Sequence, residues 1–90
     1  MTAEVEYVLV ELAKRYDKNE DMQKVTHEDL GMDLDEFNKA LKELIQVGYL
    51  PGGTKVVNPT GRDIYFSGKE LSEEAKKKVK EIEKSLLEEQ

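Results

Sequence analysis

The predicted fold depends on residues 25–37, which read Val25-Thr26-His27-Glu28-Asp29-Leu30-Gly31-Met32-Asp33-Leu34-Asp35-Glu36-Phe37. Thr26 and Asp29 have the spacing of a capping box, in which side chains and backbone N–H groups bond reciprocally at a helix start. Asp33 and Glu36 repeat this spacing seven residues later. Gly31 lies between the two starts, at a position suited to end the first helix. The stretch therefore predicts a very short helix, a tight turn and a new helix.

Helical periodicity extends this prediction in both directions. Apolar residues at helical spacing predict a first helix over residues 3–17, with Thr2 as its N-cap. The helix that starts at Asp33 is expected to end at Gly48, and Tyr49-Leu50 to enter a strand. Ser72 is expected to cap a last helix, whose apolar stripe is Ala75, Val79, Ile82 and Leu86.

A β-hairpin is predicted between the last two helices. Its arms are residues 54–57 and 62–66, which are rich in β-prone side chains. Asn58-Pro59-Thr60-Gly61 between them fits a type I turn, with Asn first, Pro second and Gly fourth. The predicted class is α+β: a winged helix-turn-helix domain over residues 1–90. It has a three-helix core, a small antiparallel β wing and a C-terminal helix packed on the first helix.

Composition limits the class of protein. Ninety residues suit one domain, and 38% of them are hydrophobic. Cysteine is absent, which excludes disulfides and thiolate metal sites. No apolar run is as long as a membrane span, and the N-terminus lacks the pattern of a signal peptide. We therefore expect a cytoplasmic protein that does not enter membranes.

Several segments resemble a known family. Residues 32–37, 40–45 and 47–50 resemble the helix-turn-helix core of small winged-helix proteins, and residues 70–75 resemble the start of their last helix. The resemblance covers residues 3–87 and points to the YjcQ-like family of small bacterial and prophage proteins, although Ala75 stands where that family's pattern has glycine. It implies a winged-helix scaffold, with DNA binding and transcription regulation assumed by analogy.

The sequence supports two kinds of partner. A DNA-binding surface would use polar residues of the helix after Asp33 and basic residues of the wing. These residues are Asn38, Lys39, Lys42, Gln46, Lys55 and Arg62. Two observations argue against DNA binding. Asp35 lies at the end of the helix that would enter a groove, and the net charge of the chain is −6, from 14 Lys+Arg and 20 Asp+Glu. An ordinary solvated helix face explains the same residues.

The alternative is a protein-interaction or prophage accessory module that binds through an apolar surface of the first and last helices. Its candidate residues are Tyr7, Val10, Val79, Ile82 and Leu86. The 4-3-4 spacing of the last helix also resembles a short heptad pattern, so a homodimer seam and a contact within one chain both remain open.

Catalysis is not predicted. The only histidine, His27, stands in the first turn of a capped helix, and no cluster of His and carboxylates has metal-ligand spacing. No serine lies in a recognisable catalytic frame, and the glycines follow a helix rather than a strand, unlike a phosphate-binding loop. We expect a non-enzymatic protein without cofactor, metal or small-molecule substrate.

Overall fold

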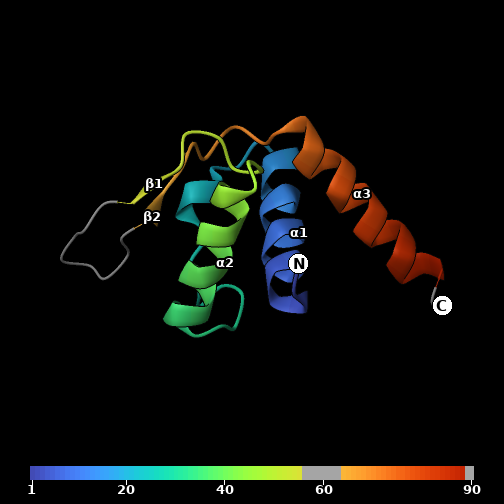
Figure 1. Ribbon diagram of the computed structural model, residues 1–90, viewed down its shortest axis with the longest axis horizontal. Coiled ribbons are helices and arrows are strands. Elements are labelled where there is room, and N and C mark those ends of the chain that lie inside the picture. Colours follow the sequence, from blue (N-terminus) through green and yellow to red (C-terminus); the bar gives the residue numbers. More distant parts are fainter. Residues whose placement is uncertain (56–63, 89–90) are drawn as a thin grey trace.

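The computed structural model describes residues 1–55 and 64–88 of the chain. The elements in order are α1 (Ala3–Asp17), the 3₁₀ helix η1 (Met22–Lys24), α2 (Leu34–Gln46), β1 (Thr54–Lys55), β2 (Ile64–Tyr65) and α3 (Glu73–Glu88). Figure 1 shows α1 in the middle, with α2 and the strand pair on one side and α3 on the other. Both α1 and α2 begin at the lower end of that view.

The predicted winged helix-turn-helix architecture is wrong. The described part of the chain is a small, mostly helical structure with three α-helices and one short strand pair. It is not a three-helix core followed by a wing and a fourth helix. The missing element is the short helix that the signals after Thr26 had predicted, because residues 27–31 form a hydrogen-bonded turn.

The turn forms because its start and stop signals are too close together. The capping box is present: the Thr26 N–H donates to Asp29 Oδ2 (3.0 Å) and the Asp29 N–H donates to Thr26 Oγ1 (3.2 Å). Gly31 has a φ of 66°, its N–H donates to the Glu28 carbonyl, and the Met32 N–H donates to the His27 carbonyl. These two bonds are a Schellman motif, which ends a helix. The stop follows the start by a single turn, so no α-helix develops.

Acidification should weaken this capping turn. The Thr26 backbone N–H, and then its hydroxyl, hold the pKa of Asp29 below its ordinary value. A lowered carboxyl pKa adds stability above the unfolded pKa, and that stability is lost as pH falls through the folded pKa. We therefore expect the Thr26 amide resonance to titrate with a midpoint below that of an unperturbed aspartate, and not to titrate in Asp29→Asn. A midpoint at the ordinary value would contradict the capping geometry.

The other helix boundaries agree in part with the predictions. Asp33 is the N-cap of α2, but its side chain makes no capping hydrogen bond, so the second capping box is wrong. Gly48 ends α2 as predicted: its φ is 83°, and the Tyr49 N–H donates to the Leu44 carbonyl (2.9 Å). The strand expected at Tyr49-Leu50 is absent, because Tyr49 closes the Schellman turn that follows α2 and the chain bends at both residues.

Within the described residues, the predicted hairpin arms contain a strand pair, while residues 56, 57, 62 and 63 of the arms lie outside them. β1 and β2 are antiparallel, with Thr54 opposite Tyr65 and Lys55 opposite Ile64. The predicted turn at residues 58–61 lies outside the described residues. The chain after β2 is tied to η1, since the Phe66 N–H donates to Gln23 Oε1 (3.0 Å) and the Met22 N–H donates to the Gly68 carbonyl (2.8 Å).

All three α-helices contribute to one hydrophobic core. Its largest fully buried side chains include Leu9 and Leu12 of α1 and Phe37, Leu41 and Leu44 of α2. α3 adds Ala75 and Val79 near its start and then leaves the body of the protein. The molecule is therefore elongated, with extents of 43 × 24 × 23 Å.

Candidate functional site

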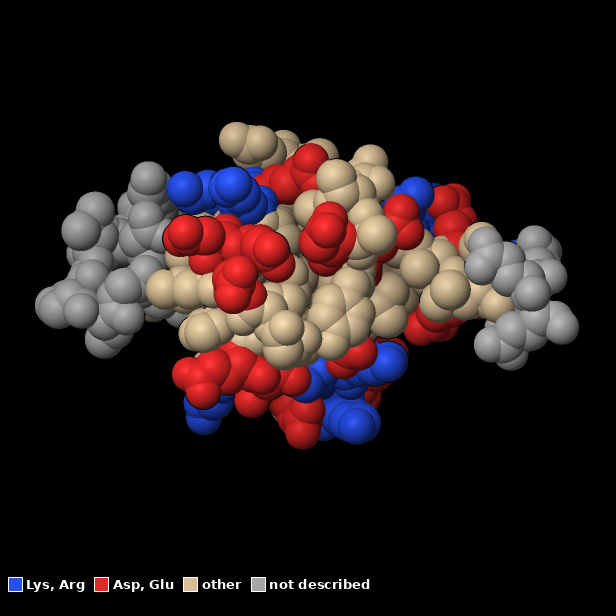
Figure 2. Space-filling model, turned by 90° about the horizontal axis from the view of Figure 1, so that it is seen from below, with Lys and Arg blue, Asp and Glu red and all other residues tan. Residues whose placement is uncertain are grey.

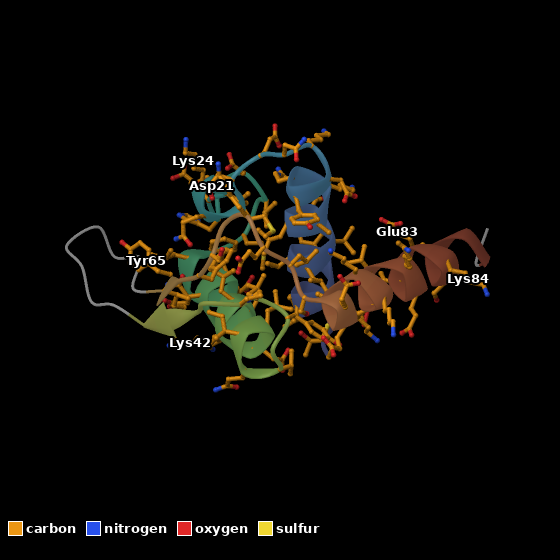
Figure 3. The ribbon with its side chains drawn as sticks, turned by 90° about the horizontal axis from the view of Figure 1, so that it is seen from above. Asp21, Lys24, Lys42, Tyr65, Glu83 and Lys84 are labelled. Carbon is orange, nitrogen blue, oxygen red and sulfur yellow. The ribbon has the colours of Figure 1, made fainter. Side chains whose placement is uncertain are left out.

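The outward face of α2 carries fewer available polar groups than the DNA-binding prediction requires. Lys39, Lys42 and Gln46 are exposed, but Asn38 is only partly exposed and its Oδ1 is buried without a hydrogen-bond partner among the described residues. Lys55 lies in β1, and its side chain is not described, while Arg62 lies outside the described residues. Figure 3 places Lys42 and Tyr65 on the hairpin side of the molecule.

Acidic groups surround the start of α2. Asp33, Asp35 and Glu36 are exposed there, and Glu4 is exposed on the neighbouring end of α1. Figure 2 looks onto this end of the molecule and shows clustered carboxylates beside uncharged surface. A nucleic acid that approached the first turn of α2 would meet like charge, which weakens association.

A cavity of about 290 Å³ lies between the start of α1 and one side of α2. It is lined by Thr2, Glu4, Val5, Glu36, Lys39, Ala40 and Glu43. Glu43 Oε2 is buried and has no hydrogen-bond partner in the described part of the chain. Three carboxylates and one lysine line this space, so its polar character is acidic. In residues 1–55 and 64–88, no group of three His, Cys, Asp or Glu side chains could hold a metal ion.

A second cavity, of about 400 Å³, lies between the end of α1 and the segment that follows η1. It is lined by three carboxylates and two basic side chains: Arg15, Glu20, Asp21, Lys24, Val25 and Asp29 make up the lining. The Arg15 guanidinium lies 2.6 Å from Glu11 Oε2. Burial opposes the charge on Glu11, but hydrogen bonds from Arg15 and Lys14 lower its pKa overall. Arg15 is thus paired with a carboxylate of its own helix.

The five residues predicted as a protein interface do not share one surface. Tyr7 is 43% exposed, and its hydroxyl donates to the Leu30 carbonyl (3.0 Å), next to the segment that leads into α2. Ile82 and Leu86 lie on α3, on the other side of α1 (Figure 1). Val79 is buried, whereas Val10 and Ile82 are half-buried against the core.

The sequence predictions missed how strongly charge is segregated. The net charge of the whole chain does not show that the first half of α1 and the start of α2 lie together. The sequence does contain a sign of the segregation, since residues 1–13 and 25–38 contain no lysine or arginine. The two acidic segments could therefore be identified from the sequence, but only the fold shows that they form one surface.

No helix in the described ranges combines the length and apolar character needed to cross a bilayer. No protein-family model matches the chain, and no match was found among curated proteins or solved structures. The resemblance to the YjcQ-like family therefore stays a prediction, and function has to be argued from the surfaces of the chain itself.

Proposed function

We propose that this protein is a binding module for another protein, which it contacts through the protruding C-terminal half of α3. The observation that carries the proposal is an apolar stripe that continues beyond the body of the protein. Ala75 and Val79 pack in the core, Ile82 is half-buried, and Leu86 is 54% exposed. The stripe keeps helical spacing throughout, although more than half of the surface of its last residue, Leu86, is not covered by the described part of the chain.

An isolated helix gains little stability in water, and most helices in proteins are stabilised by packing of an amphipathic face. The last turns of α3 lack that packing, yet the side chain that continues the stripe is leucine rather than a polar residue. Proteins recognise such faces by receiving the apolar side chains at i, i+3 and i+4 positions in a groove. Ile82 and Leu86 have this spacing and would be the anchors.

The charges of α2 favour a protein over DNA as the partner. Lys39 and Lys42 face outward, but Asp33, Asp35 and Glu36 lie at the end of α2 that would enter a groove. A DNA-binding module in which this face reads bases should bind random duplex DNA at low salt, with an affinity that falls as salt rises. For this chain we expect no such binding.

Site-specific photo-crosslinking in cells tests the proposal. A photoreactive amino acid replaces Leu86 in the stripe, Lys77 on the opposite face of α3, or Lys42 on the outward face of α2. We expect a discrete protein adduct from position 86 that positions 77 and 42 do not give, identified by mass spectrometry. Equal adducts at positions 86 and 77, no adduct at position 86, or a DNA adduct at position 42 would each contradict it.

A further inference from the structure

One end of the molecule is formed by two segments without lysine or arginine. Residues 1–13 supply most of α1, and residues 25–38 supply the capping turn and the start of α2. The first segment contains three carboxylates and the second contains five: Glu4, Glu6, Glu11, Glu28, Asp29, Asp33, Asp35 and Glu36. Glu11 pairs with Lys14 and Arg15, and Asp29 lines the other cavity beside Arg15 and Lys24, so six of them remain for this end.

A hydrogen bond and a shared cavity bring the two segments together. The Tyr7 hydroxyl donates to the Leu30 carbonyl at 3.0 Å, and Glu4 and Glu36 line the same cavity. The N-termini of α1 and α2 both lie at this end (Figure 1). Each helix terminus adds roughly half a positive charge, and Lys39 lines the same cavity, but together these charges are smaller than those of the six remaining carboxylates. The local field is therefore negative.

Four apolar side chains of these two segments remain accessible to solvent. Met1 and Tyr7 are 47% and 43% exposed, and Met32 and Leu34 are partly exposed at the start of α2. We call these four residues the acid-bordered strip. In Figure 2, uncharged surface runs between two charged groups, in each of which carboxylates lie beside lysine or arginine side chains. The hydrogen bond to Leu30 fixes the ring of Tyr7, so this anchor loses little conformational freedom on binding.

We propose that the acid-bordered strip binds a basic amphipathic segment of another protein, in which lysine or arginine side chains flank apolar ones. Tyrosine is enriched among the residues that dominate binding energy, and methionine adapts to irregular apolar surfaces. Carboxylates around such a contact select a basic partner and speed its association. This surface is separate from α3, so the inference does not depend on the function proposed above.

Calorimetric titration with two synthetic peptides tests the inference on the whole protein. The first peptide is an amphipathic helix of leucine and lysine, and the second carries glutamate at every lysine position. We expect binding of the leucine–lysine peptide alone, weakened by rising NaCl concentration because salt screens exposed charges. Tyr7→Ala should weaken the affinity by about tenfold. The double substitution Asp35→Asn with Glu36→Gln should weaken it and flatten its salt dependence.

Matched variants locate the contact. Tyr7→Phe keeps the ring and should retain most of the affinity, and Leu86→Ala removes an exposed leucine on α3 and should leave the affinity unchanged. Circular dichroism checks that each variant keeps its helices. Binding of both peptides alike, no binding of either, or a larger loss from Leu86→Ala than from Tyr7→Ala would overturn the proposal. Self-association that disappears in Tyr7→Ala would assign the strip to a second copy of the chain instead.

Discussion

Phe37→Ala is expected to lower the free energy of unfolding by about 3–5 kcal/mol, the range found when a large buried side chain is removed from a packed core. Phe37 is 1% exposed and lies one turn into α2, in the core that α1 and α2 share. A domain of this size has roughly 5–13 kcal/mol of stability in total. The substitution therefore removes a large part of it, and urea denaturation followed by circular dichroism measures the loss.

The matched control for Phe37→Ala lies on the opposite face of the same helix. Lys42 is exposed, so Lys42→Ala should change the free energy of unfolding by no more than about 0.5 kcal/mol. The urea dependence should keep its slope in both variants if the unfolding remains two-state. A change below about 1 kcal/mol for Phe37→Ala would mean that α2 is not packed on α1 through this side chain.

The sequence was a good guide to the long helices and their ends. Apolar spacing predicted a helix over residues 3–17, which α1 matches, and Gly48 was identified as the stop of α2 because a left-handed residue suits a helix C-terminus. The failure lies at residues 27–31. Capping signals mark where a helix can begin and end, but the length between them decides whether a helix forms. Here that length is one turn, too short to offset the cost of helix nucleation.

Local sequence patterns also did not predict the contacts between residues far apart in the chain. The η1 helix owes its position to backbone and side-chain bonds with residues 66 and 68, more than 40 positions away in the chain. The charged end of the molecule has the same origin. Its carboxylates come from two segments, and only the packing of α1 beside α2 joins them into one surface. The acidic residues could thus be identified from the sequence, whereas the surface that they form together could not be predicted.

Gly68→Ala should be the second strongly destabilising substitution, by about 1–3 kcal/mol, the usual cost of overpacking. A Cβ at Gly68 would collide with Asp21 Oδ1 and lie 2.9 Å from Gln23 Cβ. Asp21 cannot turn away without loss, because its Oδ1 accepts from the Gln23 N–H (2.9 Å) as the N-cap of η1. The added methyl group should therefore separate η1 from the segment after β2. Thermal and urea denaturation measure the effect.

A double-mutant cycle distinguishes this collision from a general effect of alanine at position 68. If the Asp21 side chain causes the cost, Gly68→Ala should destabilise Asp21→Ala less than it destabilises the unsubstituted protein. Ser67→Ala, one residue earlier, keeps the backbone bond from the Ser67 N–H to the Pro51 carbonyl and should cost no more than about 0.5 kcal/mol. Strictly additive effects would show that the collision with Asp21 is relieved by a backbone shift. The contact between η1 and residue 68 would then be looser than the 2.8 Å bond from Met22 to Gly68 implies.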